Sequence, residues 1–71
     1  MYYQLLKGGI DDSIYGAQRI DTDSITSFIF DPANTDYQKF KVDVAGGVEL
    51  QDPDGNVMTQ AEVNAFLETI P

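Results

Sequence analysis

The chain has 71 residues, of which twelve are acidic and four are basic, for a formal charge of -8, and it contains neither cysteine nor histidine. This length suits a single domain over residues 1–71 with a small core, because a chain of this size buries only about 60% of its unfolded surface. The missing residue types exclude disulfides and nearly all zinc or transition-metal sites, so we expect no metal and no cofactor. Small domains without such cross-links usually gain stability from a partner or from a second copy.

The negative charge argues against nucleic acids and anionic membranes as partners, since both bind clustered Lys and Arg. It either keeps the domain in solution or attracts a basic protein, and composition leaves both readings open. No apolar run approaches the roughly 20 residues that cross a bilayer. Residues 1–7 lack the basic region and the long apolar core of a secretion signal. We therefore expect a protein made in the cytoplasm, with no signal peptide and no transmembrane segment.

Residues 1–30 predict an antiparallel three-stranded β-meander. The expected strands, each rich in aromatic or aliphatic residues, are Tyr2–Leu6, Ser13–Ile20 and Ile25–Phe30. Polar or glycine-containing turns separate them. Gly16 and Ala17 weaken the second strand and indicate a bulge there. In the third strand, Phe28 and Phe30 fall on one face while Ile25 and Ile29 fall on the other, which indicates cover on both sides.

Residues 31–47 predict a turn followed by a helix. Pro32 fixes its own φ and holds Asp31 in an extended conformation, which ends the preceding strand. Thr35 and Gln38 have the spacing of a capping box, so we expect the helix to run from about residue 36 to residue 45. Two glycines then supply its left-handed cap. The apolar stripe of this helix is Tyr37, Phe40 and Val44.

Residues 48–58 predict a short β-hairpin around a type I turn at Asp52-Pro53-Asp54-Gly55. Residues 59–71 predict a second helix, in which Thr59 and Glu62 form another capping box. Its apolar stripe is Val63, Phe66, Leu67 and Ile70. The fold class is therefore α+β: a small antiparallel three-stranded meander followed by a helix, a short β-hairpin and a C-terminal helix.

The turn at Asp52-Pro53-Asp54-Gly55 also matches part of an EF-hand calcium loop. Leu50 falls where the first carboxylate should be, and Ala61 falls where the bidentate glutamate should be. Pro53 stiffens a loop that would have to wrap around an ion. We therefore expect a hairpin turn and no metal site.

Catalysis finds little support in the residue types. The serines at positions 13, 24 and 27 have no histidine base anywhere in the chain. The carboxylate pairs Asp11/Asp12 and Asp21/Asp23 lie in polar turns, where nothing desolvates them and shifts their pKa values. We expect no enzymatic activity.

Eight aromatic side chains, four Tyr and four Phe, are many for this length. They either all fill one core, with tyrosine hydroxyls reaching the surface, or some of them face a partner. Apolar residues on both faces of the third strand favour a partner for part of the set. The contact residues that we expect are Tyr2, Tyr3, Tyr15, Phe28 and Ile29.

The run Phe30-Asp31-Pro32-Ala33-Asn34-Thr35-Asp36-Tyr37-Gln38 resembles a motif of very small proteins from tailed bacteriophages, Phe-Asp-Pro-Ala-Asn-x-Asp-Tyr-Gln. The resemblance covers about residues 1–47, of which only residues 30–38 are distinctive. The chain departs from the group at Lys41 and Asp43, where relatives are more apolar, and it continues into a hairpin and a second helix. The resemblance implies a phage origin and supplies no catalytic residue. Such proteins often accompany virion structural genes.

We expect a non-enzymatic component of the phage virion, either a head decoration or cement subunit or a tail or fibre adaptor. Its partners would be other virion proteins or copies of itself. The alternative is a phage-encoded acidic host-takeover or inhibitor protein that binds a basic host partner. Carboxylates gathered in turns favour the first hypothesis, because a DNA mimic needs them spaced like phosphates along one face.

Overall fold

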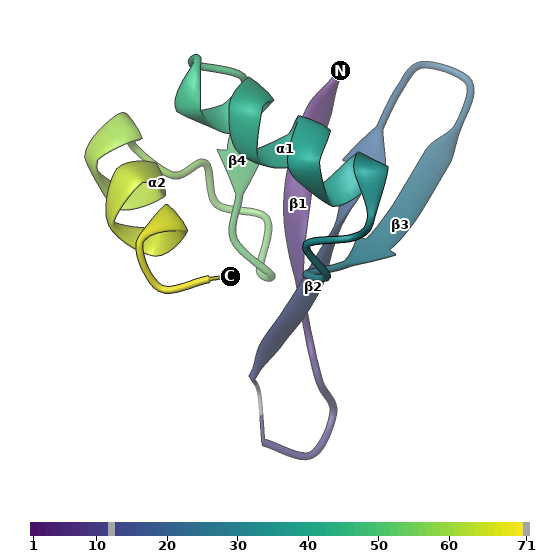
Figure 1. Ribbon diagram of the computed structural model, residues 1–71, viewed down its shortest axis with the longest axis vertical. Helices are drawn as coiled ribbons and strands as arrows, with labels where there is room; N and C mark the ends of the chain where they lie inside the picture. The colour runs from purple at the N-terminus through teal and green to yellow at the C-terminus, as the bar shows by residue number, and fades with distance from the viewer. Residues whose placement is uncertain (12, 71) are drawn as a thin grey trace.

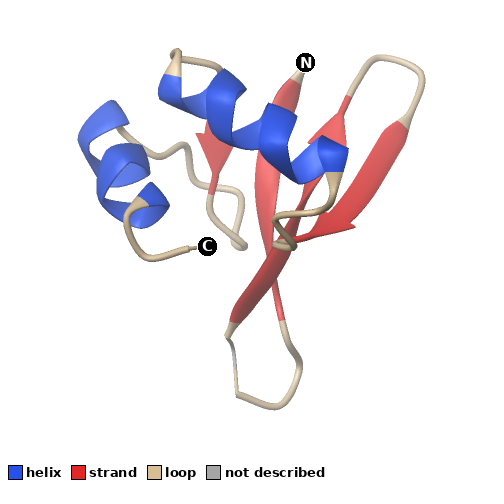
Figure 2. Cartoon of the chain, in the orientation of Figure 1, coloured by secondary structure: helices blue, strands red, loops and turns tan. Residues whose placement is uncertain are grey.

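A four-stranded sheet and two helices make up the computed structural model, which describes residues 1–11 and 13–70 (Figure 1, Figure 2). The strands lie in the order β3-β2-β1-β4. Strands β1, β2 and β3 are antiparallel neighbours, so the predicted meander and the α+β class are confirmed. Their bounds are Tyr2–Lys7, Ile14–Ile20 and Ile25–Ile29.

The predicted hairpin at residues 48–58 is present, but its first arm, strand β4 (Leu50–Gln51), also joins the sheet, which was not predicted. Leu50 and Gln51 pair in parallel with Tyr3 and Gln4 of β1, and the two expected hairpin arms meet at an isolated bridge from Gln51 to Val57. The physical reason is that β2 pairs with only one edge of β1. The backbone N–H and C=O groups along the other edge of β1 also need hydrogen-bond partners. The chain reaches that edge through a helix, because parallel neighbours require a long crossover connection.

Helix α1 (Thr35–Ala45) is capped by Asn34, so the capping box predicted at Thr35 and Gln38 is wrong. The Oδ1 atom of Asn34 accepts hydrogen bonds from the backbone N–H groups of Asp36, at 2.9 Å, and Tyr37, at 3.1 Å. Thr35 is already the first helical residue. Asparagine is among the strongest N-cap residues, so the cap moves one position towards the N-terminus.

The turn before α1 explains this shift. Asp31 Oδ1 accepts from the backbone N–H of Ala33 at 3.0 Å, and its carbonyl oxygen accepts from the N–H of Asn34 at 2.8 Å. The turn leaves Asn34 extended, with φ -85° and ψ 121°, as an N-cap requires. The side chain of Gln38 donates to the carbonyl oxygen of Pro32 at 2.8 Å and is not available to Thr35.

The C-terminal end of α1 and the N-terminal end of the second helix follow the sequence rules. The second helix ends at Leu67, so its predicted extension through Ile70 is wrong. Gly47 has φ +106° and donates to Val44 O, while Val48 donates to Asp43 O, so α1 ends in a Schellman motif. Helix α2 (Gln60–Leu67) begins with the predicted capping box: Thr59 Oγ1 accepts from Glu62 N at 3.2 Å, and Glu62 Oε1 accepts from Thr59 N at 2.9 Å.

The core lies between α1 and the sheet, which α1 crosses (Figure 1). The three residues of its predicted stripe, Tyr37, Phe40 and Val44, are fully buried. The ring of Tyr3 meets that of Phe40 edge-on at 5.1 Å, and edge-on pairs add about 0.5–1.5 kcal/mol each beyond area burial. The whole buried cluster is Tyr3, Leu5, Ala17, Phe28, Tyr37, Phe40, Val44, Leu50 and Val63.

Candidate interaction surface

The sheet has a second face that the helices do not cover. Residues paired directly across neighbouring strands point their side chains to the same side, and successive residues alternate. Tyr3, Leu5, Ala17 and Phe28 are buried in the core that α1 covers. The strand residues between them therefore point the opposite way. We call these the open face: Tyr2, Gln4, Leu6, Gly16, Gln18, Ile20, Ile25, Ser27, Ile29 and Gln51.

Strand register arranges the open face in three rows. One row, apolar, is Tyr2, Ile20 and Ile25, and another is Leu6, Gly16 and Ile29. The row between them is polar and consists of Gln51, Gln4, Gln18 and Ser27. Ile25 is 63% exposed and Ile29 is 55% exposed, although isoleucine is among the residue types most often buried.

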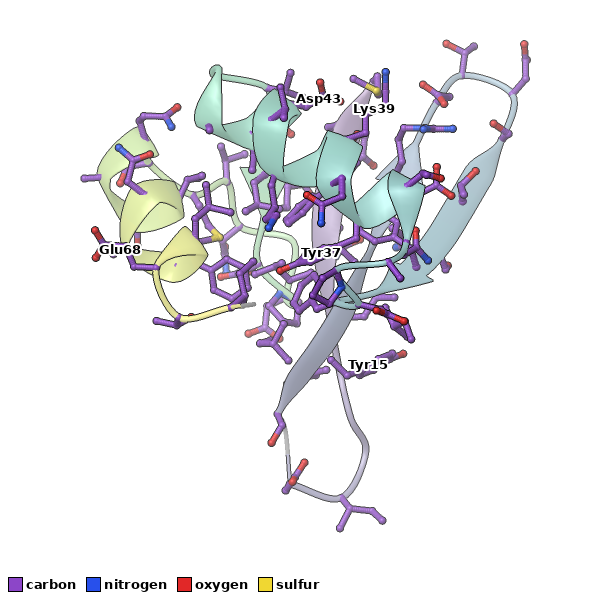
Figure 3. The ribbon with its side chains drawn as sticks, viewed as in Figure 1. Tyr15, Tyr37, Lys39, Asp43 and Glu68 are labelled. Atoms are coloured by element: carbon purple, nitrogen blue, oxygen red, sulfur yellow. The ribbon has the colours of Figure 1, made fainter. Side chains whose placement is uncertain are left out.

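A bulge in β2 follows directly on the pairing of Gly16 in the second apolar row. The pairing of β1 with β2 shifts after Leu6, which lies opposite Gly16, so that Lys7 lies opposite Ile14 and Tyr15 is the extra residue. A Cβ atom on Gly16 would clash with the carbonyl oxygen of Phe28, which explains the glycine. The bulge predicted at Gly16 is thus present, and it leaves Tyr15 51% exposed on the part of β2 that extends beyond α1 (Figure 3).

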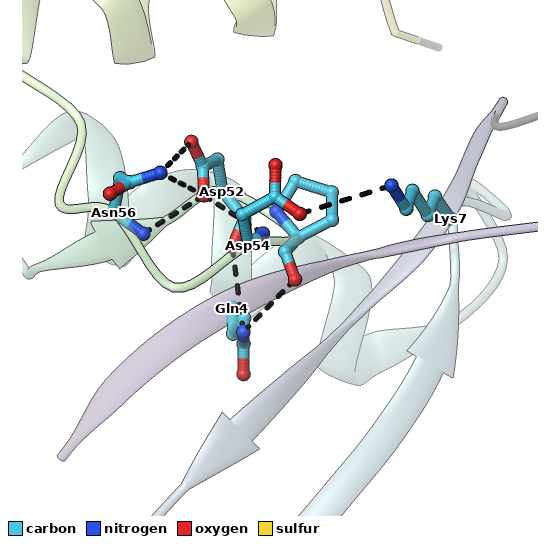
Figure 4. A network of polar contacts seen from close by, with 6 residues as sticks. Gln4, Lys7, Asp52, Asp54 and Asn56 are labelled. Carbon is cyan, nitrogen blue, oxygen red and sulfur yellow. Dashed lines mark hydrogen bonds and ion pairs between the residues drawn. The ribbon is translucent and has the colours of Figure 1, made fainter.

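The polar row is held by side-chain hydrogen bonds. Gln18 Nε2 donates to Gln4 Oε1 at 3.1 Å, and Gln4 Nε2 in turn reaches the carbonyl oxygen of Asp52 at 3.4 Å (Figure 4). Gln51 Nε2 donates to Glu49 Oε2 at 2.7 Å. These bonds keep the amides aligned across the sheet, between the two apolar rows.

The open face carries no charge, although sixteen residues of the chain are charged. The ten residues of the open face, all within the described chain, are apolar, glycine, serine or glutamine. On the β4 side, charged residues adjoin both ends of the strand: Glu49 immediately precedes β4, and Asp52 immediately follows it. Depletion of charge in the centre with charged residues at the rim is the compositional mark of protein interfaces.

The structure separates the five predicted contact residues. Tyr15 and Ile29 are exposed, and Tyr2 lies half-buried on the open face. Tyr3, 1% exposed, and Phe28, 6% exposed, are wrong as contact residues, because strand alternation turns both side chains into the core beneath α1. Sequence reasoning missed Leu6, Ile20, Ile25 and the glutamines, which period-two alternation selects once one strand's orientation is known.

Six of the eight aromatic side chains fill or adjoin the core, so the interpretation that all eight fill it is wrong. Phe30, for example, lies 5.2 Å from Tyr37 and 5.9 Å from Phe66, measured between ring centroids. Two aromatic residues remain outside: Tyr2 and Tyr15. The set of six is Tyr3, Phe28, Phe30, Tyr37, Phe40 and Phe66.

The calcium-like loop uses its carboxylate within the turn. Asp52 Oδ1 accepts from the backbone N–H groups of Asp54 and Asn56, each at 2.9 Å (Figure 4). Hydrogen bonds from Asn56 hold the pKa of Asp52 below its usual value. Gly55 has φ +92°, which a tight turn of this kind assigns to glycine. Across residues 1–11 and 13–70, no group of three or more Asp and Glu side chains is placed to hold a metal ion.

The candidate catalytic carboxylates lie in turns. The backbone N–H of Ser13 donates to Asp11 Oδ1 at 3.1 Å, and this bond lowers the pKa of Asp11, the opposite of what a general acid needs at neutral pH. Asp12 lies outside the described residues. Asp21 accepts from Arg19 Nε at 3.2 Å. The described part of the chain contains no pocket.

One ionisable pair reaches into the core. The hydroxyl of Tyr3 donates to Asp43 Oδ2 at 2.7 Å, joining β1 to α1. Burial, reinforced by the neighbouring carboxylate, raises the pKa of Tyr3 to about 12. The Tyr3 hydroxyl therefore stays a neutral donor at physiological pH, and its bond to Asp43 serves the fold.

Two broader observations complete the description. Neither helix in the described residues is long and apolar enough to span a bilayer. No protein-family model, no curated protein and no solved structure matches the chain.

Proposed function

We propose that this chain is a non-enzymatic protein-binding subunit whose open face is the contact surface. The observation that carries the proposal is the neutral open face of a protein with a formal charge of -8. Its exposed apolar side chains gain about 1.5–3 kcal/mol each if a partner buries them fully. The glutamine row offers amide donors and acceptors that give such a contact orientation.

We further propose that the partner belongs to a phage particle, as a head, tail or fibre protein. This location is supported by the resemblance at residues 30–38. Those residues serve the fold of this chain: Asp31 and Asn34 build the turn and cap of α1, and Tyr37 is fully buried. The motif therefore marks a shared way of folding, and the contact surface lies elsewhere, on the sheet.

Mass spectrometry of purified particles tests the location. We expect the chain in the particle at a fixed ratio to the other virion proteins. If the chain is absent from the particle and is instead recovered bound to a basic host protein, the alternative hypothesis of an acidic inhibitor is supported. A salt-sensitive complex is expected in that case, because ionic strength screens charge attraction.

A charge introduced on the open face tests the contact surface. The variant Ile25→Lys/Ile29→Lys places two ammonium groups on exposed positions of the open face, where a partner has to exclude water. We expect incorporation to fall by at least about tenfold, because an unpaired charge buried at an interface is costly. The matched control is Val42→Lys on α1, since Val42 is 72% exposed but lies off the open face. Equal loss in both variants would contradict the assignment of the surface.

A further inference from the structure

The outer edge of β3 is a second unpaired feature of the sheet. β3 ends the strand order, and no other described segment lies along its outer side (Figure 1). Asp21 N donates to Ser24 O at 2.9 Å, and Phe30 N donates to Tyr15 O at 3.3 Å, which fixes the phase of the ladder. Bonded pairs alternate with non-bonded pairs in an antiparallel ladder. The residues whose backbone groups face outward are therefore Ile25, Ser27 and Ile29.

This edge lacks the usual protection. In natural proteins, charged side chains, prolines or bulges on an edge strand prevent other strands from pairing with it. The sequence from Ile25 to Ile29, Ile-Thr-Ser-Phe-Ile, has no charge and no proline. One outward carbonyl, that of Ile29, accepts from Asp31 N at 2.9 Å. The other outward groups of β3 have no partner in the part of the chain that the structure describes.

Uncompensated carboxylates bracket the edge. Arg19 is the nearby cation, and its guanidinium pairs with Asp21, at 3.2 Å, and Asp36, at 3.9 Å. Asp23, in the turn before β3, and Asp31, just after it, have no cationic partner within the described residues. Each end of β3 therefore presents a negative charge, while the strand itself presents none.

We propose that β3 binds an extended segment of a partner protein by strand addition, and that this segment is an uncharged β-branched run with Lys or Arg at both ends. An uncharged run of seven residues opposite residues 24–30 places the flanking cations opposite Asp23 and Asp31. This inference rests on the proposed protein-binding function and names the chemistry of the partner. Strand addition uses backbone hydrogen bonds for affinity, so it needs no pocket.

Charge disfavours a second copy as the occupant. An antiparallel β3 pair centred on Ser27 sets Asp23 opposite Asp31 of the copy, at both ends of the contact. Like charges directly opposite each other destabilise a strand pair. A partner segment with Lys or Arg at both ends would instead place positive charges beside Asp23 and Asp31. Its alternate side chains would lie beside Ile25 and Ile29, extending the open face by one strand.

Peptide binding tests the inference directly. The probe is a capped peptide, Lys-Val-Thr-Val-Thr-Val-Thr-Val-Lys, compared with the same peptide carrying Glu at both ends. The readout is NMR titration together with hydrogen exchange of the backbone N–H groups of Ile25, Ser27 and Ile29. We expect the lysine peptide to slow exchange at these positions and to bind at least about tenfold tighter at low salt, a difference that shrinks as salt screens the charges.

Ser27→Pro removes an outward N–H without breaking the ladder to β2, because the backbone of Ser27 faces away from that strand. Ser27→Thr keeps the N–H and is the matched control. We expect Ser27→Pro to weaken lysine-peptide binding by about tenfold or more, since the ring blocks the approaching strand. Ser27→Thr should bind like the natural chain.

Three outcomes would overturn the inference: no binding of the lysine peptide, equal binding of the glutamate peptide at low salt, or undiminished binding by Ser27→Pro. A dimer in sedimentation experiments that Ser27→Pro abolishes would assign the edge to a second copy. The proposed function fails separately. If the Ser27→Pro variant joins its assembly normally but the Ile25→Lys/Ile29→Lys variant does not, the open face remains the contact surface and strand addition at the edge is excluded.

Discussion

At the scale of single residues, the position along a strand determines which of two identical neighbours enters the core. Tyr2 and Tyr3 have the same side chain, yet Tyr3 is 1% exposed beneath α1 and Tyr2 lies on the open face. The hydroxyl of Tyr3 escapes the cost of burial by donating to Asp43. Figure 3 shows Asp43 on α1 close to the beginning of the chain. This bond ties β1 to α1 at a distance of forty residues in sequence.

The Tyr3 hydroxyl supports a prediction about alkaline pH. Tyr3→Phe should lower the free energy of unfolding by about 1–2 kcal/mol at pH 7, because one hydrogen bond to a charged group is lost. The folded-state pKa of about 12 lies above the ordinary value of 10.0, so the contribution of Tyr3 is complete below pH 10. It disappears as the pH rises from 10 to about 12.

Urea unfolding between pH 7 and pH 11.5 measures this effect. Burial also raises the pKa of Tyr37, so Tyr3→Phe itself should lose some stability at high pH. The natural chain should lose more, and the difference between the two should narrow steadily above pH 10. Parallel pH profiles for the two proteins would show that the Tyr3 hydroxyl contributes nothing specific.

At the scale of elements, local chemistry sets the helix ends. The sequence offers two N-cap residues in succession, Asn34 and Thr35, and spacing alone favoured Thr35 because of Gln38. The structure selects Asn34, since the preceding turn directs the chain there and occupies Gln38 with Pro32. At α2 no competing cap precedes Thr59, and the predicted box with Glu62 forms.

Alanine substitutions at the start of α1 test this choice. Asn34→Ala should lower the free energy of unfolding by about 1 kcal/mol, because two backbone N–H groups lose their acceptor. Thr35→Ala should leave stability unchanged or raise it slightly, since alanine has the better helix propensity at a first-turn position. Thermal and urea unfolding of both variants give the comparison. If Thr35→Ala lost more stability than Asn34→Ala, the assignment of Asn34 as the cap would be contradicted in favour of Thr35.

At the scale of the whole molecule, the sequence predicts short-range features and leaves long-range ones open. Hydrophobic periodicity identified the strands, both helices and the stripe of Tyr37, Phe40 and Val44, all of which depend on nearby residues. The parallel pairing of β4 with β1 could not be predicted, because it depends on which sheet edge is free after folding. The sequence also does not determine which face of the sheet α1 covers. It therefore cannot predict which of two identical neighbours, such as Tyr2 and Tyr3, enters the core.

The open face shows the same limit. Alternation in β3 separated Ile25 and Ile29 from Phe28 and Phe30, and the structure places the isoleucines outside. Only the register across four strands gathers them with the glutamine row into one neutral surface. That surface is a property of the assembled sheet, and no single stretch of sequence carries it.

Hydroxyl-radical footprinting tests the central claim, that the open face is covered in the working assembly. The isolated chain and the assembly from which it is recovered are labelled under the same conditions. We expect Ile25 and Ile29 to react freely in the isolated chain and to be protected at least about fivefold in the assembly, because a buried interface excludes water. Val42 on α1, the internal control, should react equally in both samples. Protection of Val42 with unchanged labelling of the two open-face isoleucines would contradict the account.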